Sequence, residues 1–120
     1  MTIAYWIVAG ITALAFLAAG TMKASRSKEA LAASGMGWVE DFAGPGVRLI
    51  GVAEIAGGIG LIVPMLIGVV PALGPVAAIA LALTMIGAVV VHIRRKEPAI
   101  PALVLLVLAG SAAVLGFMLV

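Results

Sequence analysis

A single carboxylate, that of Glu54, is the most informative feature of this sequence. It is the only Asp, Glu, Lys or Arg between residues 49 and 93, and its neighbours are apolar or very small. A charged side chain at depth in a lipid bilayer costs about 2.5 kcal/mol or more on insertion scales, so it normally faces a partner or a water-filled cavity. Glu54 therefore indicates an ion pair, a ligand site or a proton-transfer site.

Three other polar residues are candidate partners for Glu54. Arg48 lies near the start of the predicted membrane helix of residues 47–63 that contains Glu54. It is about 9 Å from Glu54 along the helix axis, but an offset of six residues places the two on different faces. Lys23 ends the preceding helix and His92 ends the following one, and both ends meet at the same side of the bundle. We predict one polar cluster near the cytoplasmic mouth of the bundle, made of Lys23, Arg48, Glu54 and His92.

Two interpretations of this cluster stay open. In the first, it forms a small pocket for a quinone-like headgroup, or a proton path in which Glu54 and His92 exchange protons. In the second, Lys23 or Arg48 pairs with the buried carboxylate, the remaining cations extend to the membrane surface, and the pair fixes the helix register without a ligand. Neither interpretation includes a catalytic residue.

The composition excludes several other kinds of site. The chain has no cysteine, which excludes thiol chemistry, iron–sulfur clusters and thiolate-bound haem within it. One histidine cannot supply bis-histidine haem ligation or a multi-histidine metal site, so we expect no metal site. The net charge is only +2 and the cations lie at helix ends, so we expect no nucleic-acid partner.

Small residues surround Glu54 at helical spacing. Gly51 and Gly58 lie three residues before and four residues after it and share its face, while Gly57 and Gly60 extend the small surface. Such positions let neighbouring helix backbones approach closely in a membrane. We therefore predict that these four glycines pack against other helices and bury Glu54.

The elements that must position these residues are membrane helices. The sequence is 65% hydrophobic and only 10% charged, whereas soluble domains carry about 25% charged residues. Because about 20 apolar residues span a bilayer as a helix, we predict an all-α integral membrane protein, a four-helix up-down bundle in a single domain of residues 1–120. The predicted helices are residues 2–22, 47–63, 74–93 and 99–119. We expect the first to be a retained helix and not a signal peptide, since no basic residue precedes it.

The basic residues predict the orientation. All seven Lys and Arg lie in or beside the links 23–46 and 94–97, and none lies on the opposite side. The positive-inside rule then places both links in the cytoplasm and both termini outside.

In the connector of residues 23–46, a short surface helix and interfacial anchors at Trp38 and Phe42 are as plausible as a solvated loop. Tyr5 and Trp6 are expected in an aromatic belt at the outer interface.

The motifs at the ends of these helices resemble one known family. The segments AGTMK (19–23), RLIGVAEIAGGIGL (48–61) and LTMIGAVVVHIRR (83–95) resemble the DoxX-like family of small bacterial membrane proteins. The resemblance implies a multi-pass protein of the bacterial plasma membrane, related to a group named after a subunit of a thiosulfate:quinone oxidoreductase.

From this resemblance we expect a quinone-binding or accessory membrane subunit of a redox or stress-related system, without catalytic activity of its own. Quinone is the expected cofactor, and membrane lipids, a redox partner subunit or further copies of the chain are the expected partners. The alternatives are a small transporter for an apolar or weakly acidic compound, with Glu54 as its proton-coupled group, and a purely structural or oligomeric membrane protein.

Overall fold

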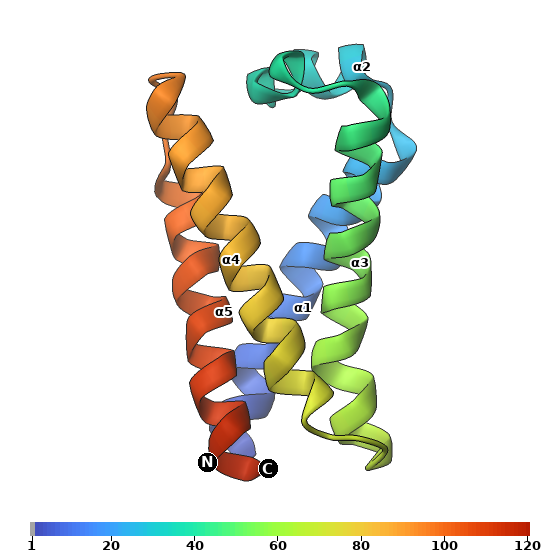
Figure 1. Cartoon of the computed structure of the whole chain (residues 1–120), viewed down its shortest axis with the longest axis vertical. Coiled ribbons are helices and arrows are strands. Elements are labelled where there is room, and N and C mark those ends of the chain that lie inside the picture. Colours follow the sequence, from blue (N-terminus) through green and yellow to red (C-terminus); the bar gives the residue numbers. More distant parts are fainter. Residues whose placement is uncertain (1) are drawn as a thin grey trace.

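The computed structural model describes residues 2–120, in which four long apolar helices form an antiparallel bundle (Figure 1). These helices are α1 (Thr2–Ser25), α3 (Gly44–Ile67), α4 (Leu73–Arg94) and α5 (Ile100–Leu119). Each is long enough to cross a bilayer, and their mean hydropathies of 2.0 to 2.5 fit a hydrocarbon environment. The predicted fold class, an all-α membrane four-helix bundle, is confirmed.

The four helices form a closed ring in which α1 contacts α3, α3 contacts α4, α4 contacts α5 and α5 contacts α1. The most extensive contacts are those within the α1–α3 pair and within the α4–α5 pair. Figure 1 shows the two pairs converging where α1 begins and α5 ends, and diverging toward the other end. Large apolar side chains cover the outside, including Ile3, Leu14 and Ile100, each at least 70% exposed. A surface of this kind is stable against lipid acyl chains.

Two helices, α1 and α3, continue more than two residues beyond their predicted C-terminal ends. The second membrane helix was predicted to end at residue 63, but α3 contains Pro64 and continues to Ile67. Proline removes one hydrogen bond, to the carbonyl of Gly60, and the rest of the helix can continue around it. The helix ends instead at Gly68, whose φ of 71° is a left-handed conformation that suits glycine. α1 likewise continues to Ser25, which places Lys23 in its last turn.

The connector between α1 and α3 is folded. It contains α2 (Lys28–Ala33) and the 3₁₀ helix η1 (Gly37–Asp41), which lie across the end where the helix pairs diverge (Figure 1). Leu31 and Val39 are fully buried and pack with the buried Val47 at the start of α3. The rings of Trp38 and Phe42 pack edge to face, with their centroids 5.5 Å apart.

Tyr5 ties the opposite end of the bundle together. Its side chain is fully buried and its hydroxyl donates a 2.7 Å hydrogen bond to the carbonyl of Leu61 in α3. A Cβ at Gly74 of α4 would lie 2.9 Å from the hydroxyl, and one at Gly116 of α5 would lie 3.0 Å from the ring. The expectation that Tyr5 belongs to an interfacial belt was wrong, because these glycines leave room for the ring inside the bundle.

A close backbone approach joins α1 to α3. A Cβ at Gly51 would lie 2.6 Å from the carbonyl oxygen of Gly20 and 2.7 Å from the amide nitrogen of Ala24. A Cβ at Gly20 would likewise lie 2.6 Å from the carbonyl oxygen of Gly51. These atoms belong to the backbone and cannot turn away, so any side chain here would push the two helices apart.

We predict that Gly51→Ala destabilises the fold by about 1–3 kcal/mol, as overpacking a tight contact does. Gly10→Ala is the matched control on α1, because a Cβ there meets nothing within 4 Å. The control should stay within about 1 kcal/mol of the wild type, the range of helix propensity. Unfolding by sodium dodecyl sulfate, followed by circular dichroism, measures both. Equal stabilities of the two variants would contradict the tight α1–α3 contact.

Candidate functional site

Lys23 and Glu54 form a buried ion pair between α1 and α3. The Nζ atom of Lys23 lies 2.5 Å from Oε1 of Glu54, and the two side chains are 10% and 1% exposed. The pair joins residues 31 positions apart in the sequence. The pair therefore gives the carboxylate of Glu54 the oppositely charged partner that it needs inside an apolar bundle.

The close approach of α1 and α3 explains why these two side chains meet. Lys23 lies one turn after Gly20, and Glu54 lies one turn after Gly51. Side chains in a helix lean toward its N-terminus, and the two helices are antiparallel. Each stem therefore leans back toward the Gly20–Gly51 contact, which brings the ammonium and the carboxylate together.

The second carboxylate oxygen of Glu54 has no partner. Oε2 is buried and makes no hydrogen bond among the described residues. Buried polar atoms are paired in the great majority of cases, and an unpaired one calls for an explanation such as a ligand or a water molecule. On the other side, the Nζ of Lys23 lies 5.5 Å from the ring centroid of Trp38 in the connector, within range of a cation–π contact.

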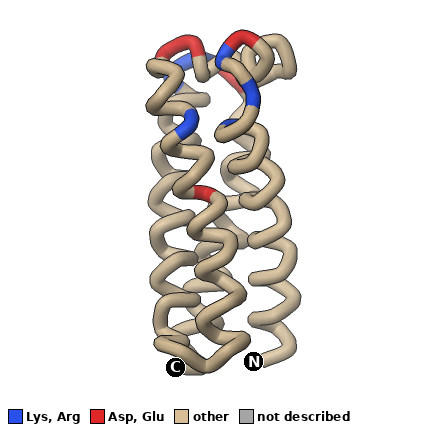
Figure 2. The backbone as a smooth tube through the Cα atoms, turned by 90° about the vertical axis from the view of Figure 1, so that its right-hand side faces the viewer, with Lys and Arg blue, Asp and Glu red and all other residues tan. Residues whose placement is uncertain are grey.

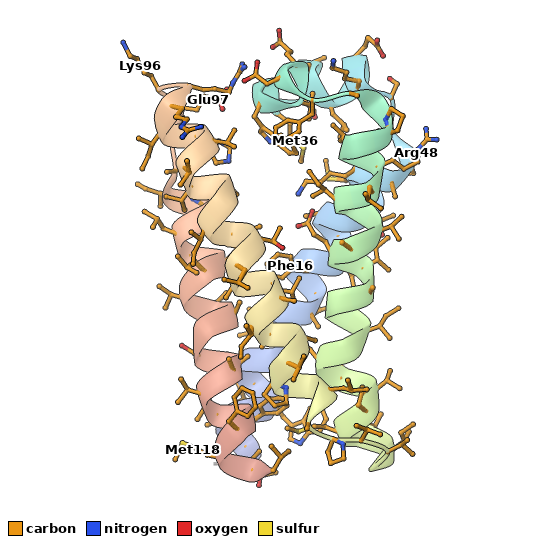
Figure 3. The ribbon with its side chains drawn as sticks, viewed as in Figure 1. Phe16, Met36, Arg48, Lys96, Glu97 and Met118 are labelled. Atoms are coloured by element: carbon orange, nitrogen blue, oxygen red, sulfur yellow. The ribbon has the colours of Figure 1, made fainter. Side chains whose placement is uncertain are left out.

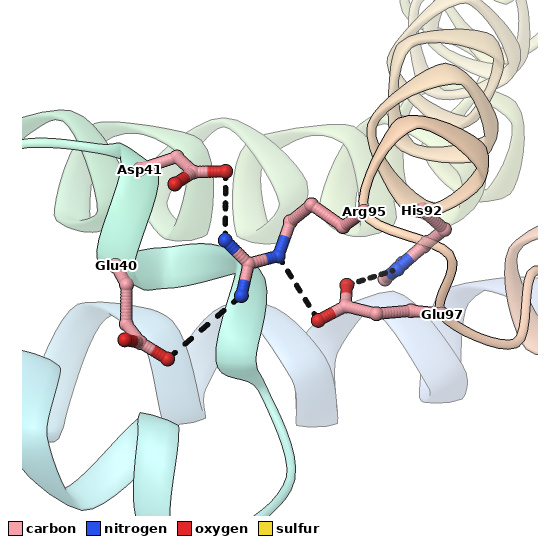
Figure 4. Close-up of polar contacts among 5 residues, drawn as sticks. All are labelled: Glu40, Asp41, His92, Arg95 and Glu97. Carbon is pink, nitrogen blue, oxygen red and sulfur yellow. Dashed lines mark hydrogen bonds and ion pairs between the residues drawn. The ribbon is translucent and has the colours of Figure 1, made fainter.

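A second polar centre links the α4–α5 turn to the connector (Figure 4). The guanidinium of Arg95 lies 2.8 Å from a carboxylate oxygen of Asp41 and 3.8 Å from one of Glu40, both in η1. It also donates a 3.0 Å hydrogen bond to Glu97, whose other oxygen lies 3.2 Å from Nδ1 of His92. We call these five residues the Arg95 cluster. It holds the connector against the α4–α5 pair at the end where the two helix pairs diverge.

The end of α4 positions this cluster. The amide of Lys96 bonds to the carbonyl of Ile93, and the amide of Glu97 bonds to that of His92, a Schellman arrangement that turns the chain back. Lys96 has a φ of 56°, a left-handed conformation that glycine usually takes in this position. The turn brings Glu97 beside Arg95 and His92, while Lys96 points away from the bundle (Figure 3).

The cluster shifts the acid–base behaviour of its members. The hydrogen bond from Arg95, helped by His92, holds the pKa of the Glu97 carboxyl below its ordinary value, although partial burial opposes this. Hydrogen bonds to Asp41 and then to Glu97 raise the pKa of Arg95, which stays charged at any ordinary pH.

Of the four residues predicted to form one polar cluster, the structure brings together two, Lys23 and Glu54. Arg48 is exposed and points away from the bundle (Figure 3). His92 bonds to Glu97 and makes no hydrogen bond to Glu54. Figure 2 shows the Lys and Arg positions gathered at one end of the bundle, as the sequence predicts, but position along the bundle did not determine which residues touch.

The four glycines around Glu54 contact two different helices. A Cβ at Gly58 would lie 3.0 Å from Leu17, so Gly51 and Gly58 both face α1. A Cβ at Gly57 would lie 2.6 Å from Leu81, and one at Gly60 would lie 3.0 Å from Ala77, so these two face α4. Small side chains thus let both neighbouring helices approach α3.

Several contributors to these polar centres were not identified from the sequence. Gly20 was not singled out, although its spacing from Lys23 matches that of Gly51 from Glu54. Trp38 was considered only as a membrane anchor, and Arg95 only as a topology signal. Glu97, two residues after Arg95, was the local signal for a polar contact, whereas Glu40 and Asp41 lie far from Arg95 in the sequence and reach it only through the fold. Among the described residues, no group of His, Asp and Glu side chains is arranged to hold a metal ion.

Comparison with known proteins identifies one family. The model of the DoxX-like family matches residues 7–114, nearly the whole chain, which confirms the resemblance seen in its motifs. No curated protein and no solved structure gives a significant match.

We predict that Lys23→Met destabilises the bundle by about 3–5 kcal/mol, because it leaves a buried carboxylate without its partner. The double variant Lys23→Met/Glu54→Leu should recover most of this loss, since no charge then remains inside. The free energy of unfolding in detergent, measured by sodium dodecyl sulfate titration, distinguishes the two. A Lys23→Met protein as stable as the wild type would show that the pair does not stabilise the fold.

The contacts of Glu97 predict a pH dependence. A carboxyl whose pKa is lower in the folded protein than in the unfolded chain stabilises the folded state at every pH above the unfolded-state pKa. This stabilisation is lost as the pH falls through the lower, folded-state pKa. Starting from the ordinary value of 4.5, we expect the connector to loosen as the pH drops below this value. Hydrogen–deuterium exchange of residues 37–42, corrected for the intrinsic rate, should then accelerate.

Arg95→Gln should show fast exchange in residues 37–42 already at neutral pH, with little further change in acid. Arg94→Gln is the control, because Arg94 makes no ion pair among the described residues. Identical exchange profiles for both variants would argue against the Arg95 cluster as the contact that holds the connector.

Proposed function

The chain belongs to the DoxX-like family, and on this basis we propose that it binds a quinone headgroup as the accessory membrane subunit of a redox system. Its four apolar helices make it a multi-pass membrane protein. Such a subunit needs an apolar setting for the ring and tail of the quinone, with a few polar groups that fix the headgroup.

The unpaired oxygen of Glu54 is the observation that carries this proposal. A quinol hydroxyl can donate a hydrogen bond, and Oε2 of Glu54 is a buried acceptor that receives no hydrogen bond from the described residues. A quinone carbonyl accepts one, and the ammonium of Lys23 has three donors, of which Glu54 uses one. The pair therefore offers a donor and an acceptor side by side, suited to both redox states of a quinone.

The position of the pair supports access for an apolar molecule. Lys23 retains 10% exposure, and the aromatic ring of Trp38 lies over its ammonium. The helix pairs diverge toward this end, and the Arg95 cluster ties the connector across it (Figures 1 and 4). Movement of the connector would uncover Lys23 and Trp38 while leaving the α1–α3 contact in place.

On this proposal the chain supplies binding and not catalysis. It has no cysteine, and we assign it no redox centre, so electrons would come from a partner subunit. The protein would lie in the bacterial plasma membrane with both basic links in the cytoplasm, as the positive-inside rule predicts. A redox partner would then approach the charged end.

The transporter alternative has less support. Transporters of this kind commonly bind their substrate at interrupted helices near the middle of the membrane. Here α1 and α3 are continuous through Lys23 and Glu54, and Pro64 lies ten residues beyond Glu54 without ending α3. A purely structural pair is the remaining alternative, and the binding experiment separates it from the proposal.

Quinone binding can be measured by the fluorescence of Trp38 in a Trp6→Phe background, which leaves one tryptophan, close to Lys23. A short-tailed ubiquinone or menaquinone analogue should quench this fluorescence saturably. Glu54→Gln should raise the Kd about tenfold or more, the effect of losing a hydrogen bond to a charged group. Circular dichroism checks that the variant is folded.

Glu29→Gln provides the matched control, because Glu29 is an exposed acid on α2 outside the pair. It should bind the quinone like the wild type. Unchanged binding in folded Glu54→Gln would reject the proposal and leave a structural pair. Equal losses in both variants would also reject it, because the effect would then follow the loss of an acidic charge and not the position of Glu54.

A further inference from the structure

A basic recess lies beside the ion pair, at the charged end of the bundle. It has a volume of about 150 Å³, and its lining includes four cationic side chains and no acidic one. Lys23 lies in the last turn of α1, Arg26 directly follows this helix, Lys28 comes from α2 and Arg48 from α3. The recess thus collects cations from three elements that the folded connector brings together.

Three of these cations are available to a ligand. Lys23 is paired with Glu54, but Arg26, Lys28 and Arg48 make no ion pair among the described residues. Arg26 and Arg48 are exposed and Lys28 is partly buried, so their charged ends can reach a molecule at the membrane surface. Like charges repel when they converge without a counter-ion, which favours the binding of an anion between them.

The first turn of α3 adds a further contribution. Gly44 and Pro45 line the recess, so the N-terminal end of a 24-residue helix opens onto it. Amide groups in a first helical turn have no acceptor within the helix, and the helix dipole favours negative charge there. Pro45 has no N–H, so Gly44 and Gly46 are the first-turn residues that can donate. A Cβ at Gly44 or Gly46 would meet nothing within 4 Å, so these positions leave the backbone open to a ligand.

We propose that this recess binds the phosphate of an anionic phospholipid. Its volume has room for several water-sized groups, enough for a phosphate and its immediate hydration. Arginine pairs readily with phosphate oxygens through two parallel hydrogen bonds. A lipid is favoured over a free anion because apolar side chains follow directly on α3, where Leu49 is 69% and Val52 is 51% exposed and can contact acyl chains.

This site is separate from the proposed quinone site, although Lys23 lies next to both. The anion would contact the outward-facing cations, whereas a quinone would contact the buried oxygen of Glu54. Substitutions at Arg26 and Arg48 leave the ion pair intact, so the two proposals can fail independently.

Native mass spectrometry of the full chain in detergent, titrated with dioleoyl-phosphatidylglycerol or dioleoyl-phosphatidylcholine, tests the lipid site. We expect tighter binding of the anionic lipid, weakened by salt. Arg26→Gln/Arg48→Gln should raise its Kd about 25-fold, at about fivefold for each cation near a lipid surface. Arg94→Gln/Lys96→Gln is the control, with the same change of charge in the other basic link, and it should bind like the wild type.

Three results would overturn the proposal: equal affinity for the two lipids, equal losses in the two double variants, or displacement of the lipid by inorganic phosphate at comparable concentration. The last result would assign the recess to a free anion. Arg26→Lys/Arg48→Lys keeps the charges and should retain preferential binding of the anionic lipid. If the lysine variant keeps this preference while the glutamine variant is misfolded, the lipid site is supported. Loss of the preference in a folded Arg26→Lys/Arg48→Lys protein would reject the lipid site.

Discussion

The ion pair between Lys23 and Glu54 constrains how α1 and α3 pack, because neither charge has another ionic partner among the described residues. A carboxylate among apolar side chains must be neutralised or hydrated, and a lysine from the neighbouring helix meets that need at short range. The pairing requires two helices whose backbones nearly touch. Gly20 and Gly51 allow this approach, and the antiparallel direction of the helices points the two stems toward each other.

The folded connector depends on the same arrangement. Trp38 lies over the ammonium of Lys23, and the buried Leu31, Val39 and Val47 hold the connector to the beginning of α3. Arg95 then joins η1 to the α4–α5 turn through Asp41. The charged end of the bundle is therefore closed by side-chain contacts, whereas the opposite end is closed by direct helix packing around Tyr5.

These two ends differ in the forces that hold them. Around Tyr5, glycines of α4 and α5 allow tight packing and one buried hydrogen bond, a contact that does not depend on pH near neutrality. At the charged end, exposed or half-exposed ion pairs hold the connector, and such pairs respond to pH and salt. The contacts that close the charged end therefore change with pH and salt, whereas those around Tyr5 do not.

Several properties of this protein are determined by its sequence alone. Long uncharged stretches require membrane helices, because only helices satisfy their backbone hydrogen bonds within one segment in lipid. The isolated carboxylate of Glu54 identifies the polar centre, and the glycine spacing indicates close packing around it. Hydropathy did not place the end of α3, however, because a membrane helix can continue past a proline such as Pro64.

Only the tertiary structure decided which polar residues meet. Lys23, Arg48 and His92 lie near the same end of the bundle, and the sequence offered all three as partners of Glu54. The rotation of each helix about its axis separates them, so that Lys23 faces α3, Arg48 faces outward and His92 turns toward Glu97. Helix rotation depends on contacts between distant residues, such as Gly20 with Gly51, which spacing within one helix cannot reveal.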